Sequence, residues 1–313
     1  MTVVALSGGI GGAKLALGLS RVLPPGDLLV VCNTGDDFEH LGLAISPDLD
    51  TVMYTLAGLA NRELGWGRHD ETWSFMVALE ALGGKNWFRL GDRDLAVHVE
   101  RTRRLHAGET LSAITADFCA RLGVVPRVLP MSDDPVRTRV HTDEGWLDFQ
   151  DYFVRRRCAP MVRRLAFAGA ETARPLTQVF DALADPRLEA IVICPSNPFI
   201  SIDPILAVPG MRAALAARRA PLIAVSPIIG GRAVKGPTAK MMTELGLSPS
   251  PRTVAALYGD LLDGYVVDHA DVDEATGITP AVILAQTLMT TLADREALAR
   301  TVLEAASALR GRP

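Results

Sequence analysis

Cysteine and histidine are scarce in this sequence, and those present stand far apart. The four cysteines, Cys32, Cys119, Cys158 and Cys194, form no C-x-x-C pair, and the six histidines form no H-x-x-x-H pair. Disulfide frameworks and zinc sites are recognised by such spacings, so neither is predicted. Cys32 and Cys194 end apolar runs, where a buried free thiol is the usual case.

Long apolar runs and an excess of basic residues are also missing. No stretch approaches the length of a membrane span, and the start lacks the basic region of a signal peptide. A formal net charge of -4 argues against a general nucleic-acid-binding surface. We therefore predict a cytoplasmic protein with no membrane or nucleic-acid partner. Its 313 residues are enough to bury a large core.

A glycine-rich turn near the start is the most informative feature that is present. Thr2–Leu6 is a short apolar run typical of a buried strand, and Ala13–Arg21 is predicted to be a helix. Between them lie Ser7, Gly8, Gly9, Gly11 and Gly12, and Lys14 falls in the first helical turn. Backbone N–H groups at such a turn bind phosphate, because no Cβ atoms block the approach. The alternative is a turn whose glycines only allow the helix to pack on the sheet.

Other apolar runs end in the same kind of polar turn. Leu28–Cys32 is followed by Asn33, Leu188–Cys194 by a turn containing Ser196 and Asn197, and Leu222–Val225 by Ser226. The carboxyl ends of parallel strands share one edge of a sheet, where ligands bind. We therefore predict a Rossmann-like, three-layer α/β fold holding a nucleotide or phosphorylated ligand at that edge.

Acidic side chains supply further candidates for the site. Asp48 is predicted to be the N-cap of a helix starting near Leu49, and Asp50, two residues on, points to another face. Asp133 and Asp134 follow a predicted strand and precede a predicted β-hairpin, Arg137–His141 with Trp146–Tyr152. The charged Phe88–Asp94 segment surrounds one glycine, a pattern found both on solvated helices and in loops that present ligands.

Several of these segments together resemble the signature blocks of the 2-phospho-L-lactate transferase family. They are Ser7-Gly8-Gly9, Ser46–Tyr54, Leu90–Asp94, Pro130–Val136, Phe149-Gln150-Asp151, Pro195–Pro198 and Val225–Gly230. The resemblance covers nearly the whole chain. It implies a single unit over 1–313, with a Rossmann-like core at about 1–55 and 125–290 and a mostly helical insert at about 56–124.

The resemblance also implies an activity in the biosynthesis of the deazaflavin coenzyme F-420. Members of the family transfer a phospholactyl or related phospho-acid group from a guanosine diphosphate-linked donor. The acceptor is the deazaflavin alcohol 7,8-didemethyl-8-hydroxy-5-deazariboflavin, GMP is released, Mg²⁺ is required, and the proteins are generally homodimers. Phospholactate, phosphoenolpyruvate and phosphoglycerate donors differ by few atoms, so the spacing of motifs does not select among them.

Residue roles follow from the matched blocks. Asp50 and Arg89 are implied to contact the deazaflavin acceptor, while the guanosine diphosphate portion is implied to lie on the glycine turn, Asn33, Ser196 and Asn197. Our hypothesis is that Asp50 orients or deprotonates the attacking hydroxyl and that Lys14 and Arg89 offset negative charge. Mg²⁺ selects carboxylate oxygens, which makes the candidate ligands Asp48, Asp50, Asp133 and Asp134.

Two other functions are compatible with a glycine turn on a parallel sheet. One is a regulatory protein of the same superfamily that binds a nucleotide sugar without catalysis. The other is a nucleotide-dependent oxidoreductase, in which Asp36 or Asp37 at the end of the second strand contacts a ribose. The Ser46–Tyr54 and Leu90–Asp94 blocks argue against the first, and the loose glycine spacing argues against the second.

Overall fold

A parallel β-sheet forms the centre of the computed structural model, which describes residues 2–61, 63–234 and 236–310. Within those residues, seven strands pair in the order β14-β13-β10-β9-β1-β2-β5, and each neighbouring pair is parallel. Their bounds are β1 Thr2–Ser7, β2 Leu28–Cys32, β5 Arg127–Pro130, β9 Leu188–Ile193, β10 Leu222–Val225, β13 Gly264–Asp268 and β14 Ala281–Ala285. The chain builds outward from β1 to β5 and then returns to β9 on the other side of β1. The strand order therefore reverses between β1 and β9.

The strands are apolar on both faces because both faces are covered. Along β1, Val4 and Leu6 enter one hydrophobic core, while Val3 and Ala5 enter a second one on the opposite face. This period of two is the geometry of an extended strand. It explains why the strand sequences are continuous apolar runs rather than alternating ones.

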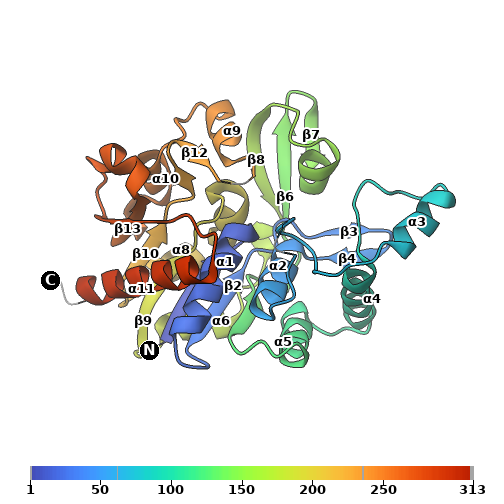
Figure 1. Cartoon of the computed structure of the whole chain (residues 1–313), viewed down its shortest axis with the longest axis horizontal. Coiled ribbons are helices and arrows are strands. Elements are labelled where there is room, and N and C mark those ends of the chain that lie inside the picture. Colours follow the sequence, from blue (N-terminus) through green and yellow to red (C-terminus); the bar gives the residue numbers. More distant parts are fainter. Residues whose placement is uncertain (1, 62, 235, 311–313) are drawn as a thin grey trace.

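Helices cover the sheet on both sides and complete a three-layer α/β fold, as predicted. The core containing Val3 is covered by α1 Gly9–Val22, α2 Pro47–Leu56, α5 Leu111–Arg121 and α11 Leu292–Leu309. The opposite core is covered by α6 Thr177–Ala184, α7 Asp203–Leu206, α8 Met211–Ala216, α9 Thr238–Glu244 and α10 Pro251–Tyr258. In Figure 1, α1 and α11 pass in front of the strands. No helix in the described part of the chain is long and apolar enough to cross a bilayer.

Three small antiparallel sheets accompany the central one. They consist of β3 Phe38–His40 with β4 Leu43–Ile45, β6 Arg137–Thr142 with β7 Gly145–Asp148 and β8 Val162–Ala168, and β11 Ile228–Ile229 with β12 Arg232–Ala233. The predicted hairpin is confirmed as β6 and β7. The prediction was wrong in extending its second strand to Tyr152, because a π-helical turn occupies Asp151–Arg155. Strand β8 was not predicted, since Arg163 and Arg164 make it look like a solvated basic run.

Residues 56–124 add helices but, among those described, no strand of the central sheet. Here α3 Ser74–Ala81 and α4 Asp92–His106 pack with the β3–β4 hairpin around Ile45, Met76 and Leu90. Figure 1 shows α3 at the end of the molecule farthest from β13. The boundaries proposed for a helical insert remain a prediction.

Candidate active site

A cavity of about 580 Å³ opens at the carboxyl edge of the central sheet. Its walls include residues just after β1, β2, β9, β10 and β14, among them Gly9, Asp36, Ser196, Ser226 and Thr287. The cavity therefore lies where the strand order reverses, the usual ligand site of open α/β sheets. Loops from the β6–β8 sheet and from the α3–α4 region complete the walls.

The glycine turn is packed tightly between neighbouring loops. Gly8 donates its N–H to Ser196 Oγ at 3.2 Å, and that hydroxyl donates to Gly8 O at 2.8 Å. A Cβ at Gly11 would lie 2.2 Å from Pro195 O, and one at Gly12 would lie 2.4 Å from Ser7 Oγ. Glycine at 11 and 12 is thus required for packing, as the alternative interpretation held. Gly8, Gly9 and Gly11 line the cavity, whereas Gly12 and the fully buried Ser7 lie behind it.

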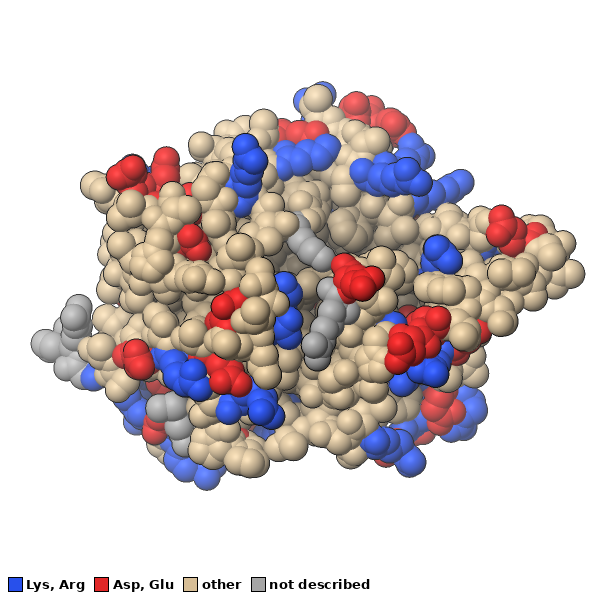
Figure 2. Space-filling model, in the orientation of Figure 1, with Lys and Arg blue, Asp and Glu red and all other residues tan. Residues whose placement is uncertain are grey.

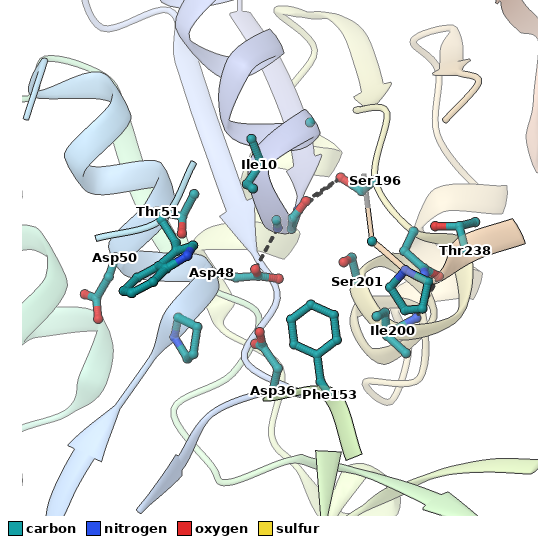
Figure 3. Close-up of a pocket in the computed structure, with 18 of the residues that line it drawn as sticks. Ile10, Asp36, Asp48, Asp50, Thr51, Phe153, Ser196, Ile200, Ser201 and Thr238 are labelled. Carbon is teal, nitrogen blue, oxygen red and sulfur yellow. Dashed lines mark hydrogen bonds between the residues drawn. The ribbon is translucent and has the colours of Figure 1, made fainter. Parts of the chain in front are cut away.

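Asn33 is fully buried and organises two carboxylates instead of lining the cavity. Its Nδ2 donates to Asp48 Oδ2 at 2.9 Å, to Asp36 Oδ1 at 3.3 Å and to Ile200 O at 3.1 Å. Gly9 N–H donates to Asp48 Oδ1 at 2.7 Å. Figure 3 shows Asp36 and Asp48 facing the centre of the cavity near Phe153. The amide thus fixes two acids from separate elements at one place.

Asp48 does not cap its helix. Helix α2 begins at Pro47 with Ser46 at the N-cap, so the predicted cap was wrong and Asp48 sits in the first turn. Burial raises the pKa of Asp48 to about 6, and the hydrogen bonds from Asn33 and Gly9 act in the opposite direction. Burial, followed by the charges of Asp48 and Asp37, raises the pKa of Asp36 well above its ordinary value. Two such buried carboxylates are a donor set suited to a hard divalent cation.

Asp50 faces away from this pair and belongs to a separate buried network. Arg101, only 2% exposed, donates from Nη1 to Asp50 Oδ2 at 3.0 Å and from Nη2 to Asp50 Oδ1. His98 Nδ1 lies 3.7 Å from Asp50 Oδ2, and His98 Nε2 lies 3.3 Å from Asp94 Oδ2. Tyr54 donates to Asp94 at 2.6 Å. Both oxygens of Asp50 therefore already accept a bond from a guanidinium.

This network was not predicted from the sequence. Asp94, His98 and Arg101 occupy positions i, i+4 and i+7 of α4, so they share one face of that helix. That spacing could have indicated a shared helix face, although a charged face with no identified partner is usually exposed to solvent. Asp50, Asp94 and His98 also place three possible ligand atoms within 4.8 Å of one another. The Arg101 guanidinium supplies the positive charge there, which disfavours a metal ion.

Arg89 lies on an aromatic wall of the cavity. Its guanidinium carbon is 4.2 Å from the ring centroid of Trp73. Trp87 and Phe88, both lining the cavity, meet edge to face at 5.8 Å. Trp66 lines the same region. A flat apolar ring fits such a wall, and Arg89 adds a positive charge beside it.

Three further predicted residues line the cavity. Lys14 donates to Met289 O at 2.8 Å, which holds the side chain at the β14 end. Ser196 bonds the glycine turn, and Asn197 Oδ1 accepts the N–H of Phe199 at 2.9 Å as the cap of the π-helical turn Pro198–Ile202. The polar turns after β1 and β9 are thus joined, as the shared strand edge predicts.

Asp133 and Asp134 do not reach the cavity. Asp133 accepts hydrogen bonds from the backbone and hydroxyl of Ser112 at 2.7 and 2.8 Å, at the start of α5. Arg174 holds Asp134 through bonds of 2.8 to 2.9 Å and lowers the pKa of that carboxyl to about 2. The structure therefore separates these two candidates from Asp36 and Asp48.

Fold and site together define a class: an α/β protein with a ligand cavity at the sheet reversal and paired carboxylates on its wall. The model of the family 2-phospho-L-lactate transferase CofD matches residues 3–306. The chain belongs to this family and is a transferase.

Similar proteins agree with this assignment. A phosphoenolpyruvate transferase of Kitasatospora aureofaciens is 44% identical over 99% of both chains. A 2-phospho-L-lactate transferase of Methanospirillum hungatei is 38% identical over 96% of this chain and 99% of that protein. A crystal structure of a UPF0052 family protein from Bacillus halodurans has a TM-score of 0.65 and 14% identity. It covers 96% of this chain and 98% of its own, and it supports the fold alone.

Proposed function

We propose that this protein transfers an enolpyruvyl phosphate group from a guanosine diphosphate-linked donor to a deazaflavin alcohol and releases GMP. The choice of phospho-acid is supported by five relatives named phosphoenolpyruvate transferase, which are 41 to 44% identical over most of this chain. A relative named for phospholactate is 38% identical, as are two further relatives named phosphoenolpyruvate transferase. The guanosine and deazaflavin parts follow from the resemblance of the signature blocks.

The order of features along the cavity is the observation that carries this proposal. In Figure 3, Asp36 and Asp48 lie between Asp50 and Thr51 on one side and Ser196, Ser201 and Thr238 on the other. The Ser196 side contains the glycine turn and the N-terminus of α1, whose partial positive charge suits a diphosphate. On the Asp50 side, Asp94 of the same network lines a recess with Trp66 and Trp73, and Arg89 stacks on Trp73, which suits a deazaflavin ring. Donor and acceptor would therefore meet at the two acids.

We propose that Asp36 and Asp48 hold the Mg²⁺ expected for this family. Both are buried, both face the cavity and both offer oxygen ligands, whereas Asp50 is engaged by Arg101. Bound Mg²⁺ would neutralise charge on the diphosphate oxygens. Asp36 replaces Asp133 and Asp134 in the set of ligands that we predicted from the sequence.

The reaction is a displacement at phosphorus. The primary hydroxyl oxygen of the acceptor bonds to the phosphorus of the phospho-acid. The bond from that phosphorus to the bridging oxygen breaks, and GMP leaves with the electron pair while the hydroxyl proton passes to solvent. We propose that Asp50, fixed by Arg101, accepts a hydrogen bond from the acceptor and positions it rather than taking its proton.

The test combines acceptor binding with product analysis. Titration of the fluorescent deazaflavin alcohol in Mg²⁺ and GDP should be saturable, and Arg89→Ala should weaken binding about tenfold through loss of a charged contact. Arg93→Ala, an exposed arginine outside the cavity, is the matched control. Mass spectrometry with the three GDP-linked donors should show the enolpyruvyl product forming fastest. No product from any donor, with a nucleotide sugar retained instead, would favour a regulatory binding protein.

A further inference from the structure

Three consecutive arginines begin at the last residue of the π-helical turn Asp151–Arg155, and their surroundings differ. Arg155 Nη1 lies 3.3 Å from Asp151 Oδ1, and Arg156 forms ion pairs with both Asp151 and Glu144. Arg157 lines the cavity, and its side chain has no hydrogen bond or ion pair with any residue that the structure describes. Figure 2 shows other basic side chains gathered along the upper part of this face, where Figure 1 places β7 and β8.

The backbone at this position would suit glycine better than arginine. Arg157 has φ 51° and Cys158 has φ 56°, both in the left-handed region. The turn closes with a bond of 2.9 Å from Cys158 N to Tyr152 O, the pattern in which glycine usually follows a helix end. A non-glycine residue kept in this conformation at a cavity wall points to a function for its side chain.

The acidic lining of the cavity indicates a role for the Arg157 side chain. Asp36 and Asp48 line the cavity without an ion pair to a described cation, whereas Arg101 pairs with Asp50, so an anionic donor needs positive charge to enter. Among the other described cations of the lining, Lys14 bonds Met289 O and Arg89 stacks on Trp73. The Arg157 guanidinium keeps its donors available, and their planar arrangement matches phosphate or carboxylate oxygens.

We propose that Arg157 binds an anionic oxygen of the donor, on either the diphosphate or the carboxylate of the phospho-acid. The identity of the donor rests on the proposed function, whereas binding of an anion by Arg157 can be tested without turnover. Arg157 thus extends the donor site from the central sheet to the β6–β8 sheet.

The experiment measures, by calorimetry with Mg²⁺, the affinities of inorganic pyrophosphate, GDP and the GDP-linked enolpyruvyl donor. The proteins are the wild type, Arg157→Gln, Arg157→Gly and Arg155→Gln, the last being a control that removes the same charge outside the cavity. We expect both Arg157 variants to bind the donor about 10- to 100-fold more weakly and Arg155→Gln to resemble the wild type. Equal weakening of pyrophosphate and GDP assigns Arg157 to the diphosphate, and weakening of the donor alone assigns it to the carboxylate.

Arg157→Gly also separates binding from folding. Glycine adopts positive φ without a steric cost, so its melting temperature should stay within about 2 °C of the wild type. Affinities within twofold of the wild type for all three ligands would overturn the proposal, as would a melting temperature of Arg157→Gly lower by more than about 5 °C. Wild-type GDP binding without transfer would count against the proposed function while leaving this comparison intact.

Discussion

Among single residues, the buried pair of Asp50 and Arg101 should have the largest effect on the stability of the fold. Both residues are at most 5% exposed, so each ion has lost most of its hydration and depends on the other. Removing one partner from such a pair leaves a buried charge uncompensated, which costs far more than losing a surface ion pair. Positioning of Asp50 and stability of the fold are therefore coupled.

Arg101→Gln should lower the free energy of unfolding by about 3–5 kcal/mol, because Asp50 is left without its counter-charge. Arg103→Gln on the same helix removes only an exposed pair with Glu100, and should leave the free energy of unfolding nearly unchanged. The double variant Asp50→Asn with Arg101→Gln should regain part of the loss. Urea unfolding measures all three, and equal effects of Arg101→Gln and Arg103→Gln would refute the coupling.

At the scale of elements, α11 shows how a local signal fixes the end of a helix. Thr291 Oγ1 accepts the N–H of Asp294 at 3.2 Å, and Asp294 Oδ2 accepts the N–H of Thr291 at 2.7 Å. These reciprocal bonds form a capping box. The helix they start packs Leu298 and Val302 into the core beside α1. The position of α11 on the sheet thus depends on polar groups at its first turn.

Thr291→Ala should lower the free energy of unfolding by about 1 kcal/mol at neutral pH, through loss of the cap. Thr301→Ala in the middle of the same helix should be neutral or slightly stabilising, since alanine has the higher helix propensity. Hydrogen bonds from Thr290 and Thr291 lower the pKa of Asp294. Asp294 therefore stabilises the fold at pH values above its pKa in the unfolded chain, and this stabilisation is lost as the pH falls. Denaturation at pH 7 should show the full effect of Thr291→Ala, and the effect should shrink only in acid strong enough to protonate Asp294 in the folded chain.

Across the whole molecule, the cavity joins the two cores of the central sheet to the separate core of the α3–α4 region. Its lining comes from the central sheet, the β6–β8 sheet and the α3–α4 region. A ligand that contacts all three binds only the folded chain, so it should stabilise the molecule as a whole. The proposed metal pair comes from two different elements, since Asp36 lies in the turn after β2 and Asp48 in the first turn of α2.

GDP with Mg²⁺ should therefore raise the melting temperature, by an amount equivalent to about 2.7 kcal/mol at a ligand concentration of 100 Kd. Asp48→Asn should lose the part of this shift that depends on Mg²⁺, because one proposed ligand is gone. Asp134→Asn should keep it, since Arg174 holds that residue outside the cavity. Differential scanning fluorimetry with and without Mg²⁺ makes the comparison. An unchanged Mg²⁺ response in Asp48→Asn would exclude Asp48 as a ligand.

The layers of the fold and the sheet edge that carries the site could be predicted from the amino-acid sequence. Continuous apolar strands require a sheet covered on both faces, and parallel strands bring their polar turns together. For this reason the turns at Gly8 and Ser196, separated by 188 positions, could be assigned to one site and do bond each other. The signature blocks indicated the family because each block is a short continuous stretch that can be recognised in the sequence alone.

Which side chains share a charge environment depends on long-range packing in the folded chain. The four candidate aspartates look alike in sequence, yet each has a different partner. Asn33 bonds Asp48, and Arg101 bonds Asp50. Ser112 bonds Asp133, and Arg174 bonds Asp134. Those partners are 15, 51, 21 and 40 positions away, distances at which no local pattern links two residues. Burial and long-range pairing set the role of a carboxylate, and both are properties of the folded chain.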